Sequence, residues 1–167
     1  ATPFVKEIIA NGFRLKEELG NINVVGGETK GVQLAGVNNT VLNKVQAFQA
    51  AGVNNLVKGN FSGFQVAGVY NHVMDSVKGW QAAGVANFAK NKVTGAQVAG
   101  VINFSNREMN GVQIAGVINY AKRLKGVQFG LINIADTSEG YSIGLINIVL
   151  KGYHKLSVFR NELTDFN

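Results

Sequence analysis

A short phrase of apolar, small and polar residues recurs along most of the chain. Glycines at positions 36, 52, 68, 84, 100 and 116 lie 16 residues apart, and each follows an alanine and precedes a valine. A glutamine stands three residues before each of these glycines, and an asparagine stands three residues after it. Beyond Lys125 the phrase continues in shortened units of about 14 residues. Such fixed spacing is typical of a repeat protein in which every unit is one structural element.

The length of the unit predicts its structure. Sixteen residues are too few for a helical hairpin or a propeller blade, which need roughly 34 and 40 residues. The glycines and the β-branched valine disfavour a repeated helix, and the 3.6-residue helical period is missing. One coil of a parallel β-solenoid fits, because its strands can pair with the next coil about 4.8 Å away. We therefore predict an all-β fold, a parallel β-solenoid of about eight coils of 14–16 residues.

Alternation within the shortened units predicts which side chains form the core. In residues 140–149, alternate side chains share one face, and we assign the following face to the interior: Tyr141, Ile143, Leu145, Asn147 and Val149. The longer units match this face only if each alanine-glycine pair forms a bulge or corner, where glycine permits the bend. The corresponding inward residues of the first full unit are Val32, Leu34, Val37, Asn39 and Val41.

This assignment also predicts the places of the recurring polar and aromatic residues. The asparagines stack inside as an amide ladder that fixes the register between coils, and the glutamines form a second ladder on the outside. Phe48, Phe64 and Trp80 occupy equivalent positions in successive coils. We expect them to stack in the core rather than to form a carbohydrate platform.

Three segments are expected along the chain: an N-terminal cap over residues 1–14, the solenoid over 15–152 and a strand-like tail over 153–167. The stretch from Thr2 to Ile9 predicts a short amphipathic helix with Pro3 in its first turn and Gly12 at its end. A cap is expected because a bare solenoid end exposes unpaired strand edges. Residues 15–23 predict an irregular first coil, since Gly20 and Asn23 keep the 16-residue spacing.

Two of the units carry a family resemblance. Residues 111–119 (GVQIAGVIN) and 126–133 (GVQFGLIN) resemble the GVQ(I/L)AG(L/V)xN repeats of surface-repeat proteins from Bacteroidetes and Leptospira, and the resemblance extends over about residues 31–150. Residues 152–158 (GYHKLSV) resemble the segment that, in Bacteroidetes members, leads toward an outer-membrane β-barrel. The resemblance implies a place in the bacterial outer membrane, the periplasm or the cell surface. It also implies a protein partner such as an envelope complex or an outer-membrane β-barrel.

The sequence offers few residues that could carry out catalysis. The chain has no cysteine, so thiol catalysis and cysteine-based metal sites are excluded. His72 and His154 lie too far apart in sequence and context to indicate a metal site or a paired nucleophile. Asp75 and Glu108 fall two coils apart, roughly 10 Å, near the upper limit for an inverting glycosidase pair. We predict a non-enzyme with no catalytic residue, cofactor or metal, and keep a polysaccharide-degrading β-helix as a remote alternative.

The few charges gather in the polar turns. Charged residues make up 16% of the chain, against roughly 25% in typical soluble domains, and the net charge is +6. Stacking the coils gathers the basic residues into one edge. Such an edge can serve only to keep the turns soluble and to prevent aggregation. The edge could also bind an anionic glycan or lipopolysaccharide. We predict no nucleic-acid partner, because no aromatic residues are interleaved with the edge as stacking requires. The candidate anion-binding residues are Lys58, Lys90, Lys92, Arg107, Lys122, Arg123 and Lys125.

A second candidate surface follows the corner of each coil. Two positions per coil form a row that begins with Asn38 and Thr40 and becomes apolar toward the C-terminus. If this row faces outward, its last coils present an apolar stripe of about several hundred square ångströms, the scale of a binding surface. If it faces inward, it is simply core. The candidate partner-binding residues are Ile118, Tyr120, Ile132, Ile134, Ile146 and Ile148.

These surfaces lead to one principal functional hypothesis and several alternatives. The principal hypothesis is a non-enzymatic scaffold of the bacterial envelope that docks a partner through its C-terminal apolar face. The first alternative is an adhesin-like binder of anionic glycans through the basic edge. The enzyme described above is the second. An ice-binding or self-assembling solenoid is the third, although regular threonine ranks are missing and only the flat amide ladders favour assembly.

Overall fold

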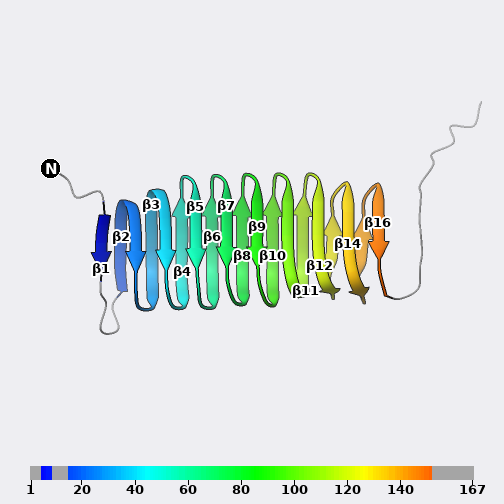
Figure 1. Cartoon of the computed structure of the whole chain (residues 1–167), viewed down its shortest axis with the longest axis horizontal. Coiled ribbons are helices and arrows are strands. Elements are labelled where there is room, and N and C mark those ends of the chain that lie inside the picture. Colours follow the sequence, from blue (N-terminus) through cyan, green and yellow to red (C-terminus); the bar gives the residue numbers. More distant parts are fainter. Residues whose placement is uncertain (1–4, 9–14, 152–167) are drawn as a thin grey trace, which may run out of the picture.

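The structure, a computed structural model, describes residues 5–8 and 15–151, which form one continuous β-solenoid (Figure 1). Within these residues every regular element is a strand, and most coils contain two strands. In chain order the strands are β1 (Val5–Ile8), β2 (Leu15–Val25), β3 (Thr29–Val41), β4 (Val45–Ala51), β5 (Asn54–Val57), β6 (Phe61–Ala67), β7 (Tyr70–Val73), β8 (Val77–Ala83), β9 (Ala86–Ala89), β10 (Val93–Ala99), β11 (Ile102–Ala115), β12 (Ile118–Leu124), β13 (Val127–Phe129), β14 (Ile132–Ser138), β15 (Tyr141–Ile143) and β16 (Ile146–Val149).

The coils stack into two parallel sheets that face each other. The first sheet holds the strand before each corner, namely β4, β6, β8, β10, β13 and β15 with the beginning of β3 and the end of β11. The second sheet holds the strand after it, namely β5, β7, β9, β12, β14 and β16 with the end of β3 and the beginning of β11. Figure 1 shows the two sets running in opposite directions, with corners along the top and turns along the bottom. The predicted parallel solenoid is confirmed.

The interior between the sheets contains apolar side chains, most of them valine or alanine, and two columns of amides. Buried apolar residues form one cluster that runs along the turn side of the interior: Val25, Val41, Val45, Val57, Phe61, Val73, Val77, Ala89, Val93, Met109, Ala121, Leu124 and Ala135. Asparagines from Asn23 to Asn133 are fully buried beside it, as the sequence predicts. The glutamines from Gln33 to Gln128 are also fully buried, so the predicted outward Gln ladder is wrong. Both amide columns therefore belong to the core.

Each asparagine of the column from Asn23 to Asn133 bonds to the asparagine of the next coil. Eight hydrogen bonds of 2.8 to 3.0 Å join Nδ2 of one asparagine to Oδ1 of the next, from Asn23 to Asn147. The same Nδ2 groups donate a second hydrogen to a backbone carbonyl oxygen, for example Asn39 to Ala50 at 2.9 Å. Since both amide hydrogens have acceptors, the buried column costs no unsatisfied donor.

The glutamine column runs with the opposite polarity. Six hydrogen bonds join Nε2 of each glutamine to Oε1 of the glutamine in the preceding coil, from Gln128 back to Gln33. At the C-terminal end the Ser142 hydroxyl donates to Oε1 of Gln128 at 3.2 Å. The two ladders thus point their amide dipoles in opposite directions along the solenoid axis. Together they fix the axial register of both sheets.

The first-sheet strands present the face opposite to the predicted one. Val32 and Phe48 are exposed on the outside of this sheet, and Trp80 reaches 55% exposure. Phe64 stacks on Trp80 with ring centroids 6.1 Å apart, so the predicted aromatic stack exists but lies outside. The other predicted core residues that point outward are Leu34, Val37, Tyr141, Ile143 and Leu145. Large apolar side chains therefore face outward because glutamine and small residues already fill the narrow interior.

The N-terminal segment differs from the expected helix where the structure describes it. Val5–Ile8 is strand β1, which pairs in parallel with β2 through Val5↔Ile22 and Ile8↔Val25. Valine and isoleucine favour the extended conformation, and the edge of β2 offers unpaired backbone groups. The remainder of the predicted cap, 1–4 and 9–14, and the tail 153–167 lie outside the described residues. Within the described residues, no helix is long and apolar enough to cross a membrane.

Candidate functional site

The carboxylates considered for catalysis are engaged by polar and basic neighbours in the described residues. No group of three or more His, Asp or Glu side chains lies close enough to hold a metal ion within the described ranges. Asp75 accepts a hydrogen bond from Asn91 Nδ2 at 2.7 Å. Glu108 instead bridges two lysines, Lys92 at 2.9 Å and Lys125 at 3.3 Å. The two carboxylates considered for a glycosidase therefore have separate structural partners.

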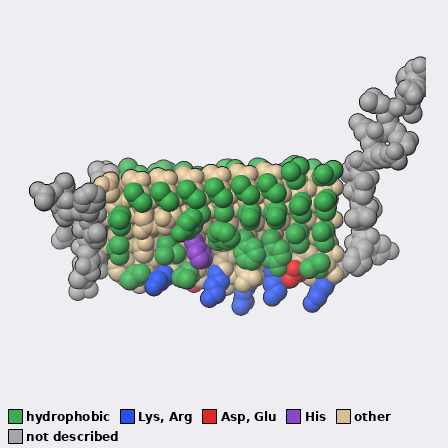
Figure 2. Space-filling model, turned by 45° about the horizontal axis from the view of Figure 1, so that its top comes forward, with side chains coloured by type: hydrophobic (Ala, Val, Ile, Leu, Met, Phe, Trp, Pro, Cys, Tyr) green, Lys and Arg blue, Asp and Glu red, His purple; other side chains and the backbone are tan. Residues whose placement is uncertain are grey.

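The charged residues gather along one edge of the solenoid, which we call the turn edge. It comprises the ends of the second-sheet strands, the turns that follow and the first residues of the next strands: 26–30, 42–46, 58–62, 74–78, 90–94, 106–110, 122–126, 136–140 and 150–151. All charged residues between positions 20 and 151 fall within it, eleven basic and five acidic. Lys78, Arg107, Lys122 and Arg123 lie in extended strand residues rather than in turns. Figure 2 shows the Lys and Arg side chains along this edge.

Ion pairs neutralise part of the turn edge. Lys92 and Lys125 share Glu108, and their hydrogen bonds and charges lower the pKa of that carboxyl, with Lys92 the largest contributor. Arg123 pairs with Glu139. The other four predicted anion-binding residues make no ion pair within the part of the chain that the structure describes: Lys58, Lys90, Arg107 and Lys122. The structure therefore places all seven on one edge, where Glu108 and Glu139 pair with three of them and the other four have no ion pair.

The predicted outward row lies on the outer face of the second sheet. Its N-terminal part is polar, since Asn38 Nδ2 donates to Thr40 Oγ1 at 2.8 Å and Asn54 Nδ2 donates to Asn38 Oδ1 at 2.5 Å. Further along, the ring of Phe104 stacks on Tyr120 at 4.8 Å between centroids, with 16° between the planes. Of the two directions that the sequence left open, the row therefore faces outward and is not part of the core.

The last coils of this row are apolar and continuous. Ile118, Ile132 and Ile146 pair in register, as do Tyr120, Ile134 and Ile148 in the adjacent column. We call these six residues the C-terminal row. Ile146 and Ile148 are exposed and the other four are partly exposed. The Tyr120 hydroxyl donates to Asp136 Oδ1 at 3.0 Å, and burial together with this contact raises its pKa.

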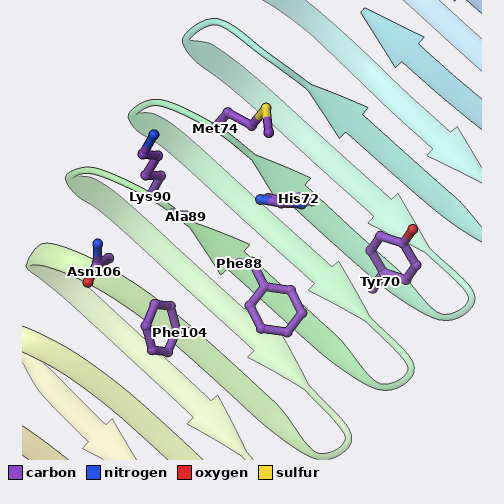
Figure 3. Close-up of a pocket in the computed structure, with 8 residues that line it drawn as sticks. All are labelled: Tyr70, His72, Met74, Phe88, Ala89, Lys90, Phe104 and Asn106. Carbon is purple, nitrogen blue, oxygen red and sulfur yellow. The ribbon is translucent and has the colours of Figure 1, made fainter.

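A hollow of about 480 Å³ opens between the second-sheet row and the turn edge (Figure 3). Aromatic side chains line one side of it, and Lys90 and Asn106 stand at the turn side. His72 contacts Phe88 edge to face, with ring centroids 6.0 Å apart. Its apolar surroundings favour the neutral imidazole, because burial lowers the pKa of His72 below 6.5.

Protonation of His72 is expected to destabilise the fold. Because its folded pKa is below the unfolded value of 6.5, the unfolded chain binds the proton more readily, and stability falls as the pH drops below that value. Replacing His72 with phenylalanine, the residue of the next two coils, should remove this component between about pH 5 and 7. Urea unfolding of both proteins across this range tests it. Identical pH profiles would contradict the expectation.

A further apolar surface was not predicted from the sequence. The outer face of the first sheet carries exposed residues such as Phe48, Phe64 and Trp80. The corners add a column of exposed aliphatic side chains, 36% to 68% exposed: Val37, Val53, Val69, Val85, Val101, Val117, Leu131 and Leu145. The sequence prediction places these first-sheet side chains in the core, so it does not predict this surface. The signal that could have revealed it is the variable size of residues 32, 48, 64, 80 and 96, which range from alanine to tryptophan.

Comparisons of the chain with protein-family models, with curated proteins and with solved structures found no match. A solenoid fold by itself does not define an activity. Function is therefore inferred from the geometry and chemistry of the three outer surfaces: the turn edge, the C-terminal row and the first-sheet face with its corner column.

Proposed function

We propose that the chain is a non-enzymatic scaffold of the bacterial cell envelope that docks a protein partner through the C-terminal row. The observation that carries this proposal is the placement of the row on the outside of the second sheet, where its six side chains form adjoining apolar columns. Contiguous exposed apolar surface of this kind typically marks a binding site. The GVQIAGVIN and GVQFGLIN units support the envelope location, and an outer-membrane β-barrel is one partner that fits it.

The construction of the solenoid suits a scaffold. Each strand from β3 to β14 pairs on both of its sides, so a coil cannot move without breaking backbone and amide ladders together. Such a rod presents its outer rows at fixed spacing, which limits the conformational entropy lost when a partner binds. Binding energy is then concentrated in the apolar side chains of the row.

Substitutions in matched positions of the same column test the docking surface. The Ile132→Lys/Ile146→Lys variant should bind a purified partner at least about tenfold more weakly, because each lysine places a charge in the apolar contact. The partner is first identified by photo-crosslinking from position 134 in envelope extract. The control, Asn38→Lys/Asn54→Lys, changes the same column at its polar end and should retain binding. Equal binding by wild type and the isoleucine variant, with circular dichroism unchanged, would exclude the surface.

The adhesin-like alternative depends on the turn edge. Lys58, Lys90, Arg107 and Lys122 have no acidic partner within residues 20–151, so they remain available to sulfate, phosphate or carboxylate groups of a glycan. Ionic strength separates the two functions. Docking through the C-terminal row should persist from about 50 to about 500 mM salt, whereas attraction through exposed lysines should be screened.

A further inference from the structure

Exposed apolar side chains are found on three sides of the solenoid, well beyond the C-terminal row. Phe64 and Trp80 are more than half exposed on the first sheet, at 54% and 55%. The corner column is exposed in every coil from Val37 to Leu145. The second sheet adds Tyr70 and the aromatic row from Phe88 to Tyr120. So much exposed apolar surface, around a core that holds two amide columns beside its apolar cluster, is unusual for a protein in water.

The fourth side is cationic. All charged side chains between residues 20 and 151 lie on the turn edge, eleven basic against five acidic. In Figure 2 the basic side chains line one long edge, and hydrophobic side chains cover the face above it. The solenoid is therefore amphipathic across its width, with the corner column and the turn edge on opposite sides. This is the charge pattern of an element that lies in an anionic membrane interface.

The depth of the apolar part matches one leaflet. Phe48 precedes the corner residue Val53 by five positions, and Lys58 follows it by five, which is about 17 Å of extended strand on either side. Half of a typical hydrocarbon core is about 15 Å. With the corner column innermost, the first-sheet aromatics and the lysines would reach the interface. Tryptophan and lysine are the residues that favour this level.

The backbone also suits a lipid environment. Each strand from β3 to β14 has a hydrogen-bonded strand on both sides, so neither sheet has a free edge along the length of these coils. The corners are bonded between coils as well, for example Val85 N to Val69 O at 2.9 Å. Unpaired backbone groups, the main obstacle to placing β-structure in hydrocarbon, are thus largely absent from these coils.

We propose that the solenoid lies along a membrane with its corner column inserted into one leaflet and its turn edge at anionic lipid headgroups. A protein partner or a second copy would cover one face, whereas a fluid leaflet can cover both sheets and the corner. Charge complementarity between the turn edge and anionic lipid sets the orientation. This inference goes beyond the proposed function because it invokes the corner column and the middle coils. A protein docked at the C-terminal row would then share the leaflet.

Trp80 is the only tryptophan of the chain and reports insertion directly. Vesicles of equimolar phosphatidylcholine and phosphatidylglycerol should shift its emission to the blue and carry the protein upward in a flotation gradient. Phosphatidylcholine vesicles alone should bind at least about tenfold more weakly, because several lysines lose their anionic partners. An emission maximum that stays unchanged with the mixed vesicles would overturn the proposal.

Two uncharged double variants test the orientation. Val69→Gln/Val85→Gln places polar groups in the corner column and should weaken binding to the mixed vesicles about tenfold or more. Leu42→Gln/Met74→Gln makes the same kind of change at similarly exposed apolar side chains on the turn edge, at 45% and 41%, and should change binding less than about threefold. Equal losses in both variants would overturn the corner-first orientation. Circular dichroism confirms that each variant is folded.

Other occupants of the apolar surface predict different results. A second copy would produce concentration-dependent dimers in vesicle-free buffer that mixed vesicles fail to dissociate, and this result would overturn the proposal. Binding that about 500 mM salt abolishes, without a Trp80 shift, would show headgroup contact without insertion and would also overturn it. Neither outcome affects the docking experiment at Ile132 and Ile146, so the two proposals can fail separately.

Discussion

Replacing Asn71 with leucine should lower the free energy of unfolding by about 3 to 5 kcal/mol. Asn71 is fully buried and accepts a hydrogen bond from Asn55 Nδ2 at 2.8 Å. Its own Nδ2 donates to Asn87 Oδ1 at 2.9 Å and to the Ala82 carbonyl oxygen at 2.8 Å. Leucine fills a similar volume but bonds to none of these groups. The loss therefore leaves buried polar atoms without partners on both sides of one coil.

Urea unfolding followed by circular dichroism measures this change. Asn106→Leu is the matched control, because Asn106 is exposed on the turn edge and belongs to neither ladder. Its effect should stay within about 0.5 kcal/mol, as for most surface substitutions. If both variants unfold at the same urea concentration, the asparagine column does not stabilise the coils.

The ladders explain why so much of the fold is predictable from the sequence. An amide column needs the same side chain at the same place in every coil, so its members repeat without variation from Asn23 to Asn147. The spacing of Asn39 and Asn55 therefore predicts the coil length and the parallel register that the strands show. The corner follows from the alanine-glycine pair, which joins two strands of different direction.

The inward face of the first sheet could not be derived from hydrophobicity. The assignment of Val32 and Leu34 to the core assumes that apolar residues are buried and polar residues exposed. Here Gln33 is fully buried because its neighbour Gln49 bonds to it along the axis. A lone polar residue would lose free energy on burial, but a stacked one does not. Constancy of size is the better guide, since a core of fixed width cannot accept both Ala96 and Trp80 in one column.

The candidate surfaces were predictable to different degrees. The outward direction of the C-terminal row follows from strand alternation after the corner. Asn119 and Asn133 point inward, so the residues on either side of each point outward. The effective charge of the turn edge does not follow from the sequence, because Glu108 reaches lysines of both neighbouring coils. Residues 92 and 125 come together only after the coils are stacked. Local sequence therefore overestimates the number of available cations.

Replacing Gly84 with alanine should cost about 3 kcal/mol or more in unfolding free energy. A Cβ at this corner would lie 2.1 Å from the carbonyl oxygen of Gly68 in the preceding coil. Backbone atoms cannot rotate away, so the coils must separate at the corner. Separation would stretch the bond from Gly84 N to Ala67 O, which is 3.2 Å long. The same close approach to the preceding glycine's carbonyl oxygen is found at Gly52, Gly68, Gly100, Gly116 and Gly144.

Gly26→Ala provides the control for this prediction. A Cβ at Gly26 would meet nothing within 4 Å, so its effect should be within about 0.5 kcal/mol in the same urea experiment. Equal stability of the Gly84 and Gly26 variants would show that the corner tolerates a wider spacing between coils. The corner column, which includes Val69 and Val85, would then be able to lengthen despite the backbone hydrogen bonds between its coils. A large loss at Gly84 alone would instead establish that close packing of backbones holds this column in line.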